Sequence, residues 1–92
     1  MKAVITVVGK DKVGIIHQVT GVLAKDNINI LNISQTILDG YFTMIMITDI
    51  INCIKSLDEL KTELNALGDS IDMDIKIQHE DIFNSMHKIW EV

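Results

Sequence analysis

Two segments of the chain have the pattern of strands that are buried on both faces, and this feature constrains the fold more than any other. Residues 2–8 (KAVITVV) and 41–48 (YFTMIMIT) carry apolar side chains at both odd and even positions. Strands of that kind are covered on both faces, so both segments are expected in the middle of a sheet. Residues 28–38 (INILNISQTIL) and 71–78 (IDMDIKIQ) instead alternate apolar with polar side chains. Alternation predicts half-buried strands, which suit the two edges of the same sheet.

A first helix is predicted between the first two strands. Apolar residues recur at helical spacing from Ile15 to Leu23, and Asp26 and Asn27 follow them. Asp11 is a candidate N-cap for this helix. A glycine inside a helix costs about 1 kcal/mol relative to alanine, so Gly21 predicts a close contact between this helix and the sheet.

Two further helices are predicted in the second half of the chain. Ser56 and Glu59 form a capping box, and a leucine stripe follows over residues 57–67. Gly68 is expected to end that helix. Residues 81–91 place five large apolar side chains on one side of a short, amphipathic C-terminal helix.

The order of elements is β-α-β-β-α-β followed by a helix, which predicts an α+β fold of the ferredoxin-like type. Asp39-Gly40 supplies a hairpin turn between the second and third strands. In this topology the antiparallel sheet has the order 4-1-3-2, which puts the two doubly apolar segments in its centre. At 92 residues, without proline or a linker-like stretch, the chain is expected to be one domain, with a core over residues 1–79.

Two helices can cover only one face of a four-stranded sheet. The other face is expected to show the second apolar set of the central strands. Its members are expected among Val4, Val8, Phe42, Met44 and Met46 or their neighbours. Such a patch is larger than monomers usually expose. It must be covered by the C-terminal helix, by a second subunit or by both.

Composition excludes several classes of function. The net charge is −5 and all eight basic residues are lysines, which argues against direct nucleic-acid binding and against phosphoryl transfer. A single cysteine, Cys53, excludes an internal disulfide and a thiolate metal motif and favours the reducing cytoplasm. The N-terminal apolar run from Ala3 to Val8 is too short for a signal peptide or a membrane span.

The segment GKDKVGIIHQVTGVLAKDNINILNIS, residues 9–34, resembles the first half of ACT domains. It carries Asp11 and Gly14 three residues apart in a strand-to-helix turn, and an "INI" strand opening at residues 28–30. The resemblance continues over the whole chain, residues 1–92. Within that group, GxDxxGI followed by NIxxxSQ is most similar to single-domain ACT proteins related to the glycine cleavage system repressor.

The resemblance implies regulation by ligand binding rather than catalysis. ACT domains typically form homodimers and hold an amino acid between the first strand-helix turn of one subunit and the start of the second strand of the other. The matching positions are Gly9, Lys10, Asp11 and Gly14 in the turn, and Asn29, Ile30 and Leu31 at the start of the strand. Amides at a helix start hold a carboxylate well. The alternative is that Asp11 only caps the helix and Gly14 only packs closely.

Other chemistries have weaker support in the sequence. His17, His79 and His87 form no recognised zinc pattern, so neither a metal nor a cofactor is expected. An acyl phosphatase of this fold would use arginine, and a metal chaperone would need a CxxC turn; the chain has neither. The alternative to a ligand-binding module is a ligand-free dimeric adaptor that acts through contacts with a partner protein.

Overall fold

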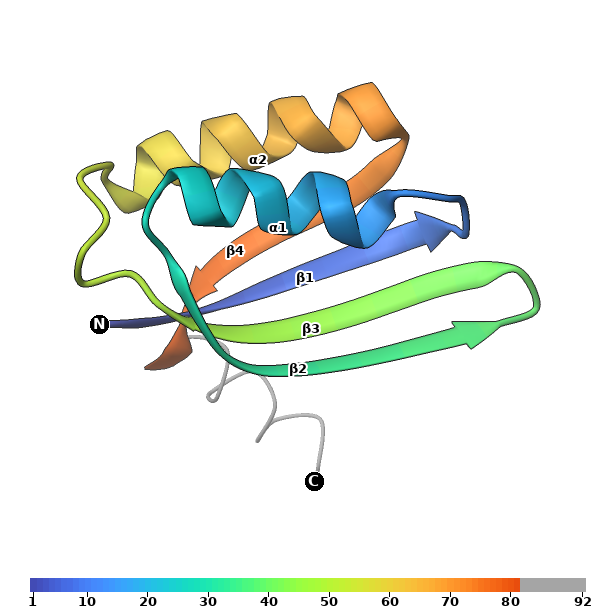
Figure 1. Ribbon diagram of the computed structural model, residues 1–92, viewed down its shortest axis with the longest axis horizontal. Helices are drawn as coiled ribbons and strands as arrows, with labels where there is room; N and C mark the ends of the chain where they lie inside the picture. Colours follow the sequence, from blue (N-terminus) through green and yellow to red (C-terminus); the bar gives the residue numbers. More distant parts are fainter. Residues whose placement is uncertain (82–92) are drawn as a thin grey trace.

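The computed structural model describes residues 1–81, which form a four-stranded antiparallel sheet with two helices (Figure 1). The elements in chain order are β1 (Lys2–Lys10), α1 (Ile15–Lys25), β2 (Asn29–Leu38), β3 (Tyr41–Asp49), α2 (Leu57–Ile71) and β4 (Met73–His79). The strand order is β2-β3-β1-β4, so the predicted topology and the two predicted central strands are confirmed. Apart from Asp81, the predicted C-terminal helix lies outside the described residues.

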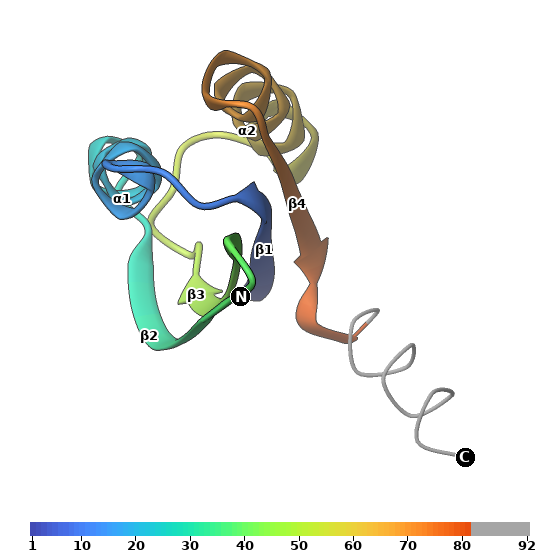
Figure 2. The ribbon, with the colours of Figure 1, turned by 90° about the vertical axis from the view of Figure 1, so that its right-hand side faces the viewer.

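The two helices lie side by side on one face of the sheet (Figure 2). The core between the two layers is aliphatic and methionine-rich. Its fully buried members include Ile5, Val7, Val19, Leu23, Met44, Met46, Leu60, Leu64 and Ile75. Within residues 1–81, neither helix combines the length and the apolar character needed to cross a bilayer.

The prediction for the opposite face was partly wrong. Phe42, Met44 and Met46 are at most 2% exposed and belong to the core beneath the helices. Since successive side chains of a strand point to opposite faces, the β3 residues on the open face include Ile45 and Ile47. The register places Val4 opposite Ile47, so Val4 and Val8 lie on the face away from the helices; Val8 is exposed there, whereas Val4 is buried.

The start of α1 differs from the prediction that Asp11 caps it. The helix begins at Ile15, and its N-cap is Gly14 in the left-handed region, with φ 89° and no side-chain cap. Asp11 lies too far before the helix to cap it. The prediction that Gly21 marks a close contact between the helix and the sheet was also wrong, because a Cβ at this position would meet nothing within 4 Å.

The start of α2 confirms the capping box. The Ser56 hydroxyl accepts from the Glu59 N–H at 3.2 Å, and the Glu59 carboxylate accepts from the Ser56 N–H at 3.1 Å. The predicted end at Gly68 was wrong, since the helix continues to Ile71 and Asp72, with φ 57°, is its C-cap. Gly68 is buried, and a Cβ there would lie 2.5 Å from the Met73 carbonyl oxygen. Gly68 therefore permits close contact between α2 and β4.

The edge strand β2 is more exposed than predicted. All of its residues are exposed except Ile30, which is partly buried. Its pairing with β3 is irregular between Ile30 and Asn32, which indicates a bulge at Leu31. At the other end Asp39 and Gly40 have φ 52° and 78°, which confirms the hairpin turn. The helices bury the apolar side chains of β3, β1 and the other edge strand, β4, and leave β2 largely uncovered.

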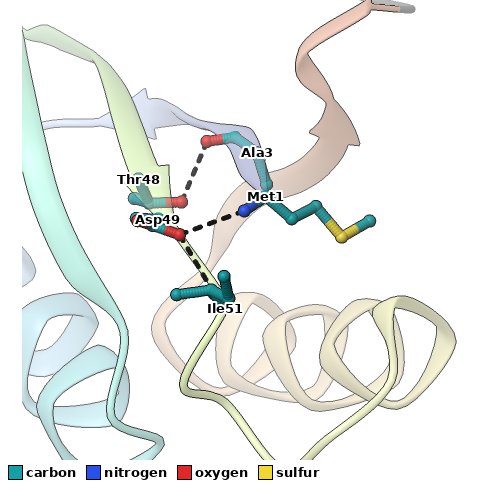
Figure 3. A network of polar contacts seen from close by, with 5 residues as sticks. All are labelled: Met1, Ala3, Thr48, Asp49 and Ile51. Carbon is teal, nitrogen blue, oxygen red and sulfur yellow. Dashed lines mark hydrogen bonds and ion pairs between the residues drawn. The ribbon is translucent and has the colours of Figure 1, made fainter.

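Asp49 joins the end of β3 to the N-terminus of the chain (Figure 3). Its carboxylate lies 3.3 Å from the Met1 ammonium and accepts from the Ile51 N–H at 3.0 Å. The hydrogen bond from Ile51 and the nearby ammonium lower the pKa of Asp49. Beside it, the buried Thr48 hydroxyl donates to the Ala3 carbonyl at 2.9 Å. These contacts fasten the start of β1 to the end of β3.

Candidate ligand-binding site

A hollow of about 170 Å³ lies where the loop between β1 and α1 meets the end of β2. Figure 1 shows why the fold creates it: α1 starts at the same end of the molecule at which β2 finishes. The lining residues are Asp11, Lys12, Gly14, Ile15, Ile16, His17, Gln35, Ile37 and Phe42. Residues as far apart in the sequence as Asp11 and Phe42 are thereby brought to one small site.

The loop before α1 is held on both sides. The Asp11 N–H donates to the Gly40 carbonyl at 2.8 Å, which ties the loop to the hairpin between β2 and β3. The Lys12 ammonium donates to the Ile71 carbonyl at the end of α2. Gly14 then takes the left-handed conformation that turns the chain into α1. Hydrogen bonds to the β2–β3 hairpin and to the end of α2 therefore hold the loop that frames the hollow.

The first turn of α1 leaves its amide groups open to a ligand. The N-cap Gly14 has no side chain, and the first turn contains no acidic residue. The first N–H groups of a helix have no partner within the helix, and they carry the positive end of its dipole. An anionic group of a ligand in this hollow would supply the missing acceptor.

The side chains around the hollow are chemically mixed. Lys12 brings a positive charge and Asp11 a negative one, and His17 and Gln35 add hydrogen-bonding groups. The apolar part combines the buried Phe42 with side chains of α1 and the exposed end of β2. The arrangement suits a small molecule that carries both charges and a short apolar portion.

The residues predicted from the sequence divide into two groups. Asp11 and Gly14 line the hollow, whereas Gly9 and Lys10, at the end of β1, do not. Gly9 has a packing role, since a Cβ there would lie 2.7 Å from the Met73 sulfur.

The other predicted group, Asn29, Ile30 and Leu31, lies at the opposite end of β2. A strand rises about 3.3 Å per residue, so Asn29 is about 26 Å from Ile37 within one chain. The structure does not bring this group to the hollow of its own chain.

The sequence interpretation missed several lining residues, above all Lys12, His17, Gln35, Ile37 and Phe42. A signal for some of them was present. In a strand-helix-strand unit of this topology the second strand ends beside the start of the helix, so the residues before Asp39-Gly40 lie close to the loop at Asp11. The direction of the Lys12 side chain had no such signal.

A second polar cluster lies at the far end of α1. The Lys55 ammonium is 3.1 Å from the Asp26 carboxylate and 2.7 Å from that of Glu63. Burial by itself would raise the pKa of Asp26, but hydrogen bonding with Glu63 and the pairing with Lys55 outweigh it and lower that pKa. The two acidic partners raise the pKa of Lys55. This cluster connects α1, α2 and the loop between β3 and α2, and it lies at the opposite end of α1 from the hollow.

Residues 1–81 contain no group of three or more side chains placed to hold a metal ion. Cys53 is a free, partly buried thiol that packs against the core. His79 accepts a hydrogen bond from the Asp81 N–H at 3.2 Å, and His87 lies outside the described residues. The hollow beside α1 is the better candidate for function.

Comparisons of the sequence and of the structure with known proteins agree on one family. The ACT domain model matches residues 3–69. A UPF0237 protein of Clostridium perfringens is 64% identical over 97% of this chain and 100% of its own length.

Solved structures agree with the sequence matches. An ACT domain protein from Streptococcus pneumoniae has 44% identity and a TM-score of 0.80, over 90% of this chain and 93% of that one. A putative glycine cleavage system transcriptional repressor has 26% identity and a TM-score of 0.71, over 86% of this chain and 47% of that one.

Proposed function

This chain belongs to the ACT domain family, and on that premise we propose that it is a non-catalytic sensor of a small amino acid. ACT domains are generally regulatory ligand-binding modules. The observation that carries the proposal is the hollow at the uncapped start of α1, where Lys12 and Asp11 place opposite charges beside free helix amides.

The chemistry of the hollow favours an amino acid over other small molecules. The ligand carboxylate would bind at the first amides of α1 and at Lys12, and its ammonium group would lie near Asp11. A volume of about 170 Å³ is below that of pockets for drug-sized ligands, about 300 Å³ or more. It therefore favours a short side chain. The similarity to a putative glycine cleavage system repressor makes glycine the first compound to test.

A second copy of the chain would complete the site through β2. This strand is an edge, and Ile33 and Ile37 on it are 45% and 53% exposed. Exposed apolar edge strands tend to pair with another chain, and a two-fold axis makes two copies of one strand antiparallel. A pairing centred between Ile33 and Ser34 would put the partner's Ile30 opposite Ile37.

This pairing gives a role to the residues at the start of β2. The partner's Asn29 would present an amide at the open side of the hollow, and the partner's Ile30 and Leu31 would extend its apolar wall. The site would then consist of the turn of one subunit, with Asp11 and Gly14, and the strand start of the other.

The test is a thermal-shift screen of the purified protein against glycine and the other common amino acids. A ligand at about one hundred times its Kd adds about 2.7 kcal/mol per site. For a domain of this size, each kcal/mol raises Tm by about 4 to 8 °C. One amino acid is expected to give a saturable shift.

Variants locate the site of binding. Lys12→Met and Asn29→Ala should each weaken the shift, whereas Lys2→Met, at the far end of β1, should leave it intact. A shift that survives both site variants would place the ligand elsewhere. If no amino acid shifts Tm, the sensor proposal fails, and the ligand-free adaptor with a partner protein takes its place.

We further place the protein in the cytoplasm, because its single thiol at Cys53 is free and packs against the core and needs no oxidising compartment. The absence of arginine from the sequence and the net charge of −5 favour regulation through protein contacts over direct binding to nucleic acid.

A further inference from the structure

Lys12 lies between the ends of the two helices. Figure 1 shows that α1 starts and α2 ends at the same end of the molecule. Lys12 belongs to the loop before α1 and lines the hollow there, yet its ammonium donates to the carbonyl of Ile71, the last residue of α2. The ammonium that the proposed site would use for a ligand carboxylate is therefore held by α2 in this structure.

The electrostatics at the end of α2 explain why it holds this ammonium. The last carbonyls of a helix have no partner within the helix, and they carry the negative end of its dipole. The last turn of α2 contains no basic residue, and Asp69 and the C-cap Asp72 add negative charge there. Lysine side chains near the end of a helix can bind such carbonyls. Lys12, 59 positions away in the sequence, thus supplies the cation that this turn lacks.

The backbone around this contact is held in place, whereas the Lys12 side chain is not. Gly9 pairs with Met73 in the sheet. A Cβ at Gly9 would lie 3.2 Å from the Asp72 carbonyl oxygen, so β1 packs closely against the turn between α2 and β4. Lys12 itself is exposed, and exposed side chains change rotamer rapidly. The ammonium can therefore move while the loop and the turn keep their places.

We propose that Lys12 is a switch that a ligand draws from the end of α2 to the hollow beside α1. This inference rests on the proposed function, which places a ligand carboxylate at the first amides of α1. A carboxylate binds an ammonium more strongly than a neutral carbonyl does, because the hydrogen bond then joins two charges. Lys12 leaves Ile71 for the ligand, and the last turn of α2 loses its cation. Binding in the hollow is thereby reported at the turn between α2 and β4.

The switch makes the coupling between the hollow and α2 reciprocal. Since the ligand and Ile71 compete for one ammonium, a cation that serves α2 in place of Lys12 strengthens ligand binding. Asp69→Lys puts such a cation in the last turn of α2. The net strength of one hydrogen bond corresponds to a rise in affinity of about two- to tenfold. Asp58→Lys makes the same change of charge at the exposed start of α2 and should leave the affinity unchanged.

The test follows the Asp72 amide of the full-length protein in nitrogen–proton correlation NMR spectra. This N–H shares a peptide group with the Ile71 carbonyl and donates to Gly68, so its chemical shift reports the contact with Lys12. Lys12→Met, without added amino acid, should displace the Asp72 signal. Titration of the wild type with glycine, and then with the other common amino acids, should displace it in the same direction. In Lys12→Met the same titration should leave the Asp72 signal where it is.

The amides of Ile15 and Ile16 at the start of α1 report binding itself, which keeps two failures apart. If their signals move and the Asp72 signal does not, the sensor stands and the switch is overturned. A displacement of Asp72 opposite to that in Lys12→Met means that the ammonium bridges ligand and helix, and this also overturns the switch. So does an Asp69→Lys protein whose affinity equals that of the wild type. If no amino acid moves any of these signals, the proposed function fails and the switch fails with it.

Discussion

Two glycines inside helices should respond to the same substitution with opposite signs. Gly21 lies in α1 and Gly68 in α2, and both are flanked by helical residues. Replacement by alanine removes the backbone freedom of glycine in the unfolded chain at either position. The gain in helix propensity is about 1 kcal/mol in each case. The environments of the two added methyl groups differ.

At Gly21 the new Cβ meets nothing within 4 Å, so Gly21→Ala should stabilise the protein by about 1 kcal/mol. At Gly68 the new Cβ would lie 2.5 Å from the carbonyl oxygen of Met73. A backbone atom cannot move aside without displacing β4, so the overpacking cost should be near the upper end of its usual range, about 3 kcal/mol. Subtracting the propensity gain leaves a net loss of about 2 kcal/mol.

The assay is thermal and urea unfolding, followed by circular dichroism, with all proteins at one concentration. Gly21→Ala should raise Tm by about 4 to 8 °C and Gly68→Ala should lower it by about 8 to 16 °C. Equal shifts of the same sign would refute the packing argument, because propensity alone would then explain both. A Gly68→Ala protein as stable as the wild type would show that α2 and β4 can separate at no cost.

Three further perturbations test other parts of the structure. Asp26→Asn should cost about 2 kcal/mol at neutral pH, since it breaks a charge-assisted contact with Lys55. The pKa of Asp26 lies below its ordinary value of 3.8, so this difference from wild type in urea unfolding should persist above that pH and vanish as the pH falls through the folded-state value. Thr48→Val should cost about 1 kcal/mol in the same assay, by removing the hydrogen bond to Ala3; an unchanged midpoint would mean that this bond adds nothing. Ile33→Lys should convert the proposed dimer to a folded monomer in analytical ultracentrifugation, and a dimer that persists in this variant would exclude pairing through β2.

The candidate site shows how far pattern and resemblance reach. They identified the turn at Asp11 and Gly14, because its residue types and spacing are local features of the chain. They did not identify Lys12, whose ammonium contacts the carbonyl of Ile71, 59 residues away. The contact of a long, flexible side chain leaves no periodic pattern in the sequence from which it could be predicted.

The order of the elements, the two central strands and the capping box of α2 were determined by the sequence alone. Each depends on neighbours in the chain: apolar alternation, or Ser56 three residues before Glu59. The face on which the helices pack was decided only in the tertiary structure. Residues 41–48 are apolar at both parities, so period-two alternation cannot tell Met44 and Met46 beneath the helices from Ile45 and Ile47 on the open face.

The exposure of β2 was also a tertiary outcome. Its alternating pattern predicts one buried face, yet the two helices cover β3, β1 and β4 and leave β2 largely uncovered, so Ile33 and Ile37 remain about half exposed. Burial depends on the width of the opposing layer, which no single segment encodes. The sequence determines which side chains are apolar, and only the packed structure decides which of them are buried by their own chain.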